Sequence, residues 1–207
     1  MYKIIASGSR GNAVIYFDKI MVDCGVPYSW LKNYVGDLSL VLLTHRHSDH
    51  FEISTVEELS FQCPALRFGC GRHMKEYLEG IQNVDVYDVG EIYRYGSYTI
   101  SPFRLYHDVE NVGYRIIRGE DKVFHATDTA HLGGLTARGY SLYGIEANYY
   151  DDSVYKVIQE KQSRGEYAYQ KGAINSHLSI QQAQDFVIRN GIPGRYEFIR
   201  LHESSEF

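Results

Sequence analysis

The chain has 207 residues, of which 44% are hydrophobic and 23% charged, and its formal net charge is −5. This length allows one domain with a sizeable core that needs no disulfide bonds. The acidic balance argues against the broad basic face of a general nucleic-acid-binding protein. Three cysteines without a C-x-x-C pair argue against a disulfide framework and against a cysteine zinc knuckle.

The N-terminal segment lacks the order of basic, apolar and small residues that marks a signal peptide. No apolar run reaches the roughly 18 residues that a membrane span needs. We therefore expect a cytoplasmic protein without a membrane segment. Internal repeats, low-complexity tracts and linkers are also missing from the sequence, which favours a single domain over residues 1–207.

Short β-rich segments dominate the first forty-odd positions and are spaced as in a hairpin-connected sheet. They lie at Tyr2–Ala6, Ala13–Phe17 and Lys19–Asp23. Pro27 then opens a predicted short helix that ends near Tyr34. The apolar run Leu40–Thr44 is typical of a buried strand.

Across the chain, strands dominate the first part of each half, and helices follow them. Helices are expected at Thr55–Phe61, Arg72–Leu78, Ser153–Ser163 and Ile180–Asn190. Strands are expected at Leu66–Phe68, Val84–Tyr87, Tyr98–Tyr106, Gly113–Arg118, Val123–Ala126, Leu142–Ala147 and Glu197–Leu201. This order predicts an α/β domain in which two sheets pack together with helices outside.

Three histidines and one aspartate lie together directly after the buried strand, in the segment Thr44–His50 (T-H-R-H-S-D-H). Imidazole and carboxylate groups are the usual ligands of zinc and similar ions. In an extended segment, residues two apart point the same way, so His45 and His47 can face one ion. Asp49 and His50 follow on a turn and can reach a second ion. The motif therefore favours two metal ions over a solvated polar loop.

Three further candidate ligands lie where later strands end. They are His107 in Y-H-D, Asp128 in A-T-D-T and His202 in R-L-H-E. Taken singly, each would more often be an ordinary polar residue at a strand end. Together with the first motif they complete a set that can hold two ions.

The order of these residues resembles the metallo-β-lactamase superfamily over nearly the whole chain. Ser7–Asn12 (S-G-S-R-G-N) and Val22–Gly25 (V-D-C-G) are similar to the opening of its phosphodiesterase branch. That branch includes WalJ (YycJ)-type bacterial nucleases, ribonuclease Z and the carbon–phosphorus-lyase cyclic phosphodiesterase. His107–Tyr114, Ala126–Thr129 and Ile145–Asn148 resemble the WalJ type most closely. The resemblance implies an αββα sandwich of two packed mixed β-sheets with helices on the outer faces.

The same resemblance implies two divalent metal ions as cofactors, and both Zn²⁺ and Mn²⁺ suit these ligands. One ion would be held by His45, His47 and His107, and the other by Asp49, His50 and His202, with Asp128 as the bridge. Asp49 would also help to position the nucleophile and so takes part in catalysis. The resemblance gives no role to His73, His125 and His131, which are interpreted as structural or surface residues.

His177 lies in S-H-L-S, where the family shows a G-H-L-S-like motif whose histidine acts on the phosphate or the leaving group. The resemblance therefore assigns His177 to catalysis and not to a metal ion. Ser179 and Gln182 have the spacing of a capping box, which places the positive end of a helix close to this ring. Glu146 or Asn148 could orient the ring. A surface histidine before a helix is the alternative interpretation.

The resemblance implies hydrolysis of a phosphodiester bond in a nucleotide or nucleic-acid substrate. The short chain without a basic arm favours a small cyclic nucleotide, as cleaved by phage anti-defence enzymes of this branch (the anti-Pycsar proteins). A WalJ-like exonuclease acting on DNA or RNA is the alternative. A non-enzymatic metal-binding relative is a further alternative, against which the intact ligand set argues. Because relatives are often homodimers and the chain carries 19 tyrosines, a homodimer is also expected.

Overall fold

The computed structural model describes residues 1–167 and 170–203. The chain divides into two compact units, Met1–Glu91 and Ile92–Phe207, and each contains one six-stranded sheet. The single domain over residues 1–207 stays a prediction. Among the helices of the described residues, none has both the length and the apolar character required to cross a membrane.

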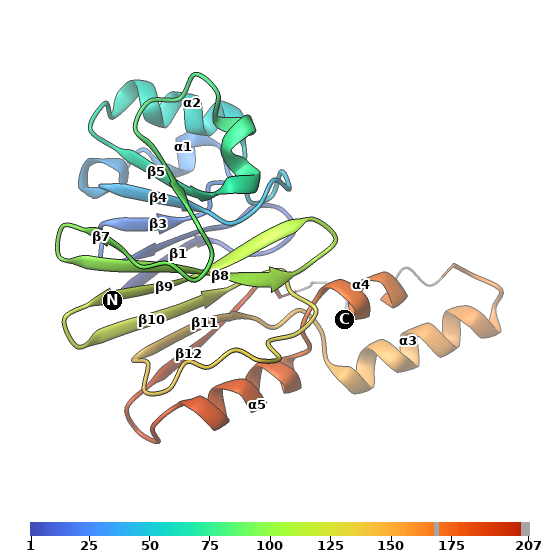
Figure 1. Cartoon of the computed structure of the whole chain (residues 1–207). Coiled ribbons are helices and arrows are strands. Elements are labelled where there is room, and N and C mark those ends of the chain that lie inside the picture. The colour runs from blue at the N-terminus through green and yellow to red at the C-terminus, as the bar shows by residue number, and fades with distance from the viewer. Residues whose placement is uncertain (168–169, 204–207) are drawn as a thin grey trace. The chain divides into compact units, whose positions relative to one another are not determined.

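The first unit, coloured blue to green in Figure 1, contains a mixed sheet with strand order β1-β2-β3-β4-β5-β6. Its strands are β1 (Tyr2–Ala6), β2 (Ala13–Tyr16), β3 (Ile20–Val22), β4 (Leu40–Leu43), β5 (Arg67–Gly71) and β6 (Val84–Tyr87). Pairing is antiparallel from β1 to β3 and parallel from β3 to β6. The parallel strands all end at one edge of the sheet, and the residues that follow β4 are the predicted ligands.

Helical segments cover one face of this first sheet. They are α1 (Tyr28–Leu31), η1 (Val35–Asp37), α2 (Ile53–Gln62) and η2 (Arg72–Leu78). Leu31 of α1, Val56 of α2 and Met74 of η2 are fully buried in one apolar cluster with Val41 and Phe68 of the sheet. Burial of this alternating set of strand residues fixes which side chains of β4 face the helices.

The second unit runs from green to red in Figure 1 and contains a mixed sheet of order β12-β11-β10-β9-β8-β7. Its strands are β7 (Tyr93–Tyr95), β8 (Tyr98–Tyr106), β9 (Glu110–Arg118), β10 (Asp121–Ala126), β11 (Leu142–Glu146) and β12 (Glu197–Leu201). β7 to β10 are antiparallel, whereas β10, β11 and β12 are parallel. The parallel strands therefore deliver the residues that follow them to one edge.

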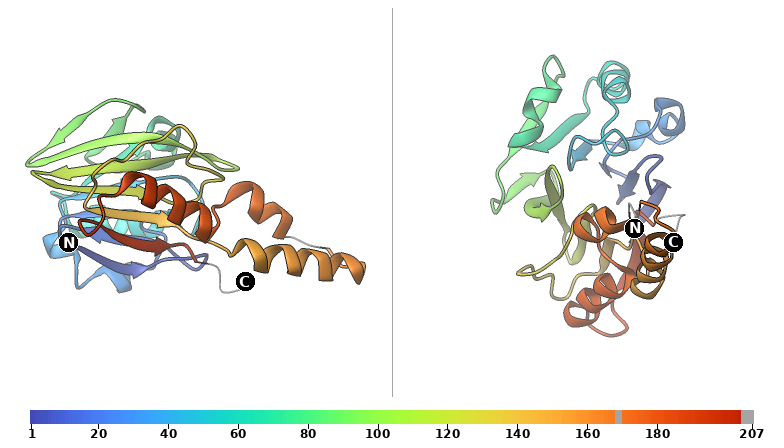
Figure 2. Two further views of the ribbon diagram at one scale, coloured as in Figure 1. Left: turned by 90° about the horizontal axis from the view of Figure 1, so that it is seen from below. Right: turned by 90° about the vertical axis from the view of Figure 1, so that its right-hand side faces the viewer.

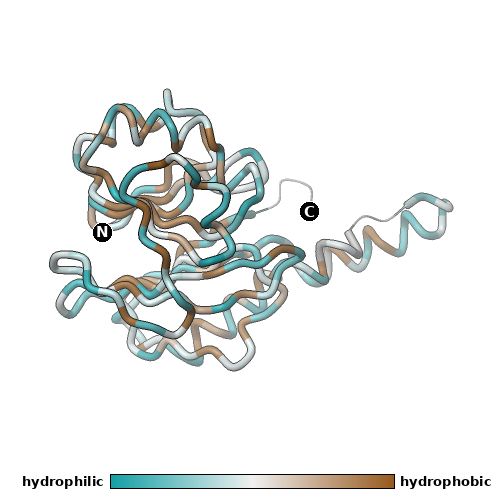
Figure 3. Tube along the Cα trace, turned by 45° about the horizontal axis from the view of Figure 1, so that its top comes forward, coloured by the Kyte–Doolittle hydropathy of each residue, from teal (hydrophilic) through white to brown (hydrophobic). Residues whose placement is uncertain are grey.

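The described residues of this unit form the helices α3 (Asp151–Ser163), α4 (Gln170–Ser176) and α5 (Ile180–Asn190). α5 packs its apolar face, with Phe186 and Val187, into the cluster that includes Phe124 of β10. α3 extends away from the sheet (Figures 1 and 2) and shares a small apolar cluster, with Val154 and Ile158, with α4. Apolar and polar stretches alternate along this helix in Figure 3, as one buried face requires.

Most of the predicted elements are present, and the differences have local causes. The strand predicted to include Phe17 ends at Tyr16, because Phe17 adopts a left-handed φ of 57°. The helix predicted from Thr55 begins at Ile53, where the Glu52 side chain caps it. Arg72–Leu78 is a 3-10 helix and not an α-helix. β7 and α4 were not predicted at all.

Candidate metal centre

All seven predicted ligands lie directly after strands, as the sequence indicates. They form two clusters: the first unit holds His45, His47, Asp49 and His50, and the second unit holds His107, Asp128 and His202.

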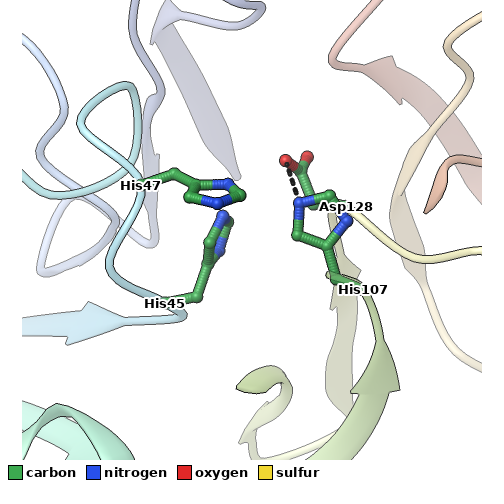
Figure 4. A group of neighbouring side chains, drawn as sticks. All are labelled: His45, His47, His107 and Asp128. Carbon is green, nitrogen blue, oxygen red and sulfur yellow. Dashed lines mark ion pairs between the residues drawn. The ribbon is translucent and has the colours of Figure 1, made fainter. Parts of the chain in front are cut away.

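The loop after β4 gathers the predicted ligands of the first unit. The ring centroids of His45 and His47 lie 4.8 Å apart, and those of His45 and His50 lie 4.3 Å apart. Figure 4 shows the His45 and His47 rings on the loop that leaves the strand. Asp49 Oδ2 lies 3.6 Å from His50 Nε2. His45 and His50 are fully buried, whereas His47 and Asp49 are half-buried, so only the last two are partly accessible to solvent.

Asp23 holds the ring of His50 in place. Asp23 is 1% exposed, and its carboxylate lies 2.7 Å from His50 Nδ1, where the ring N–H donates to it. The same carboxylate accepts hydrogen bonds from the Thr44 backbone N–H and hydroxyl, both at 2.9 Å. Burial raises the pKa of Asp23, although the charge and the hydrogen bond of His50 act in the opposite direction. With the carboxylate on Nδ1, the second ring nitrogen, Nε2, is the acceptor; it lies 3.0 Å from Asn12 Nδ2 and is the atom that could bind a metal ion.

Gly25 and Asn12 fix the turn that carries Asp49. A Cβ atom on Gly25 would lie 1.9 Å from the Asp49 carbonyl oxygen, so only glycine allows this approach. The Asn12 backbone N–H donates to the Asp49 carbonyl at 2.6 Å, and its side-chain amide donates to the same oxygen at 3.1 Å. Asn12, Asp23 and Gly25 were missed as site residues, although the quoted motifs S-G-S-R-G-N and V-D-C-G contain them.

His107 follows β8 and is oriented by the backbone. Its Nδ1–H donates to the Ser176 carbonyl oxygen at 3.0 Å. Its Nε2 lies 3.5 Å from Asp128 Oδ2, the ion pair dashed in Figure 4, and 3.1 Å from Asp108 Oδ1. Burial lowers the pKa of His107, despite the neighbouring carboxylates. A ring whose Nδ1–H is held by a backbone carbonyl and whose Nε2 faces carboxylates suits a metal ligand.

Three residues that belong to the two clusters or contact them adopt left-handed backbone conformations immediately beyond their strands. They are Asp23, Asp128 and His202, with φ angles of 62°, 53° and 51°. Such conformations are uncommon outside glycine and are maintained by surrounding contacts. At Asp128 the contact comes from the Asn111 side-chain amide, which donates to the Asp128 carbonyl oxygen at 2.7 Å. The turn that this produces leaves the Asp128 side chain 2% exposed and facing His107 and His202.

Of Glu146 and Asn148, the two residues that could orient His177 according to the sequence, Glu146 is the one in contact with its ring. The fully buried Glu146 carboxylate contacts His177 Nδ1 and accepts a hydrogen bond from the Thr129 backbone N–H at 2.8 Å. Asn148 instead donates to the His202 carbonyl oxygen at 3.0 Å and lies 3.1 Å from His202 Nδ1. Glu146 therefore contacts His177 most closely and Asn148 contacts His202, whose Nδ1 also lies 3.8 Å from Glu146 Oε1.

His177 lies between two helices. α4 ends one residue before it, and Ser179 caps α5 through the predicted capping box with Gln182. Burial lowers the pKa of His177, but the hydrogen bond and charge of Glu146, with the charges of Asp128 and Asp108, outweigh burial and raise the pKa to about 9. The Glu146 carboxylate therefore stabilises the protonated form of this ring, which is the form that a proton donor needs.

The donor groups of the second unit fit a divalent metal ion. One donor atom from each of Asp128, Glu146, His177 and His202 lies within 4.8 Å of the others. Histidine nitrogens and carboxylate oxygens at this density are what zinc and similar ions require. The clusters are therefore able to bind metal.

Replacing Glu146 with glutamine tests whether it positions His177 or binds metal. We expect kcat to fall about 100-fold with KM within twofold of the wild type and the metal content unchanged, because the amide cannot hold an imidazolium as a carboxylate does. Steady-state kinetics on a phosphodiester and elemental analysis measure the two quantities. A loss of bound metal would instead make Glu146 a ligand. Asn148→Asp serves as the control for a charge change beside His202.

A mixed sheet with helices in each unit, and histidines and aspartates at the strand ends, define a metallo-β-lactamase-type hydrolase fold. Residues 20–191 match the family described as the beta-lactamase superfamily domain. The chain therefore belongs to the metallo-β-lactamase superfamily, a hydrolase family.

Relatives and solved structures agree with this membership. Exodeoxyribonuclease YycJ from Bacillus anthracis is 25% identical over 166 residues, which cover 72% of this chain and 62% of that protein. The metallo-β-lactamase fold protein YhfI from Bacillus subtilis superposes with a TM-score of 0.77 at 19% identity. The alignment covers 100% of this chain and 87% of the YhfI chain. The short form of human tRNase Z superposes with a TM-score of 0.72 at 15% identity, and the alignment covers 99% of this chain and 92% of the tRNase Z chain.

These matches confirm the predicted αββα fold class and the phosphodiesterase branch of the superfamily. The chain spans only 62% of the length of the curated relatives that it matches. Their activities and substrates are properties of those longer proteins.

Proposed function

We propose that this chain hydrolyses phosphodiester bonds with two divalent metal ions, Zn²⁺ or Mn²⁺. The proposed ligands are His45, His47 and His107 for one ion, Asp49, His50 and His202 for the other, and Asp128 for both. The observation that carries the proposal is the Glu146–His177 pair beside Asp128 and His202. A buried carboxylate that holds an imidazole through Nδ1, beside an aspartate and a histidine able to bind metal, is the arrangement of a general acid.

The proposed mechanism divides the work between the ions and the side chains. When bound, two divalent ions would lower the pKa of a water and neutralise charge on the phosphoryl group. Asp49 would accept a hydrogen bond from the attacking water and align it with the departing oxygen. His177 would donate its Nε2 proton to that oxygen or stabilise charge on the phosphoryl group, while Glu146 holds Nδ1.

The first candidate substrate is a cyclic nucleotide. The net charge of −5 supports it, because a protein that follows a long polyanion usually carries a basic face. The second candidate is the end of a DNA or RNA strand. The similarity to exodeoxyribonucleases YycJ and WalJ supports this alternative.

A panel of substrates tests whether the protein hydrolyses phosphodiesters and which class of substrate it prefers. Purified protein is assayed with bis(p-nitrophenyl) phosphate, with cyclic purine and pyrimidine nucleotides, and with single-stranded DNA and RNA, with and without a chelator. Chelator-sensitive cleavage of cyclic nucleotides with intact polymers supports the first candidate. Cleavage of polymers alone supports the second. Metal binding without cleavage of any phosphodiester would refute the proposed function.

We also propose that the chain forms a homodimer. Large side chains are exposed on the projecting part of the second unit, where Tyr155 is 55% exposed and Tyr167 87% exposed. Aromatic residues of this kind are enriched at protein interfaces. Light scattering should give about twice the chain mass of 23.8 kDa. A monomer at micromolar concentration would contradict the proposal.

A further inference from the structure

A hollow of about 500 Å³ lies beside Asp49 within the first unit. Sites for small molecules usually have volumes of roughly 300–1000 Å³. Asp49 forms part of the lining, so a ligand here would lie next to a proposed ligand of the metal ions. The Thr44–His50 motif and the proposed mechanism give this hollow no role.

The loop that carries Arg10 into this lining is held firmly. The Gly8 backbone N–H donates to Asn12 Oδ1 at 2.9 Å, and the Gly11 N–H donates to the Gly8 carbonyl at 2.9 Å. Asn12 in turn binds the Asp49 carbonyl oxygen. Arg10 therefore lies at the tip of a fixed turn, which presents its exposed side chain with little loss of backbone entropy on binding.

The lining combines one cation with acceptors and a short apolar wall. The Arg10 guanidinium makes no hydrogen bond or ion pair with the other described residues of the first unit, so its donors remain available. Glu52 accepts a hydrogen bond from the Ser54 hydroxyl at 3.0 Å and caps α2, which fixes its carboxylate at this side. Val26 and Pro27 supply the apolar surface.

This chemistry selects a nucleoside over a second phosphate group. Besides Asp49, which is a proposed metal ligand, the lining sets the Glu52 carboxylate against the single charge of Arg10, so it has no excess of positive charge to attract a further anion. A base carbonyl can accept from the guanidinium, whereas sugar hydroxyls or ring N–H groups can donate to Glu52. The apolar wall suits the face of a base.

We propose that the pocket lined by Arg10, Val26, Pro27 and Glu52 binds the nucleoside attached to the scissile phosphate. Arg10 and Glu52 then determine which phosphodiesters are good substrates without taking part in bond cleavage. This inference rests on the proposed function, because it places the nucleoside of a substrate that the Asp49 side of the site would cleave.

Two chromogenic substrates with the same p-nitrophenolate leaving group show how much the nucleoside contributes to substrate binding. The p-nitrophenyl ester of thymidine 5′-monophosphate carries a nucleoside, and bis(p-nitrophenyl) phosphate carries none. For Arg10→Ala we expect KM for the thymidine ester to rise about 10-fold with kcat within twofold, and less than a twofold change in either constant for bis(p-nitrophenyl) phosphate. Glu52→Gln, which keeps a polar cap on α2, should give the same split. Arg94→Ala removes an exposed arginine of β7 and is the matched control.

Binding of thymidine 5′-monophosphate, measured by calorimetry on the wild type and the same variants, tests the pocket without turnover. An increase of about 10-fold in the Kd of Arg10→Ala supports the inference even if neither ester is cleaved. In that case the proposed function fails and the inference about the pocket stands. Equal losses on both esters, or no change on either ester and in binding, would overturn the inference while leaving the proposed function standing.

Discussion

Replacement of His47 with alanine is expected to lower the bound metal by at least one ion per chain and to lower kcat/KM by about 1000-fold. A bound ion contributes several kcal/mol of transition-state stabilisation, and each 1.36 kcal/mol corresponds to a factor of 10 in rate. His47 is half-buried and its ring faces His45 at 4.8 Å. The pair of Asp23 and His50 does not depend on it, so the fold should remain.

Elemental analysis and hydrolysis of bis(p-nitrophenyl) phosphate measure the two effects, and circular dichroism verifies the fold. His131→Ala is the control, because this exposed ring stacks on Tyr106 at 4.2 Å and belongs to neither cluster. It should retain the metal and at least half of the activity. Full metal content with unchanged kcat/KM in His47→Ala would exclude His47 as a ligand.

The candidate ligands could be proposed, and most strands predicted, from the sequence because both signals are local. His45 to His50 combine ligand chemistry with close spacing, and the capping box of α5 lies within four consecutive positions, Ser179–Gln182. A buried strand such as β4 is recognised by its own apolar run. Each of these patterns can be interpreted without knowledge of which segments meet in three dimensions.

The residues that orient the ligands could not be predicted in the same way. Asp23 is 27 positions from His50, and Glu146 is 31 positions from His177. Nothing in the sequence indicated the partner of Asp23, and Glu146 was named only together with Asn148 as a residue that could orient His177. Their functions arise from long-range pairing in low-dielectric surroundings, where an unpaired carboxylate would be costly.

α4 was missed for a different physical reason. Its sequence, Gln170–Ser176, is short and mostly polar and contains Gly172, so it has neither strong helix propensity nor an apolar period. The helix is supported by a tertiary contact, the packing of Ile174 against the cluster of Val154 and Ile158 on α3. Its end at Ser176 supplies the carbonyl that binds His107, so the missed helix contributes to the site.

Replacement of Gly25 with alanine should lower the free energy of unfolding by about 3 kcal/mol or more. The new methyl group would lie 1.9 Å from the Asp49 carbonyl oxygen and 2.4 Å from the His50 nitrogen. These are backbone atoms, so no side-chain rotation can relieve the overlap and the turn must move. The displaced turn would also break the hydrogen bonds of Asn12 to Asp49 and weaken metal binding.

Thermal unfolding measures this loss, and about 3 kcal/mol corresponds to a decrease in Tm of about 10 °C for a chain of this size. Gly36→Ala is the matched control, because a Cβ atom there meets no atom within 4 Å. It should leave Tm within about 2 °C, since the change mainly lowers the entropy of the unfolded chain. If Gly25→Ala kept both its Tm and its metal, the close approach of the Val22–Gly25 segment to the Asp49 turn would be wrong. The sequence motif V-D-C-G would then need another explanation than the support of the metal-binding loop.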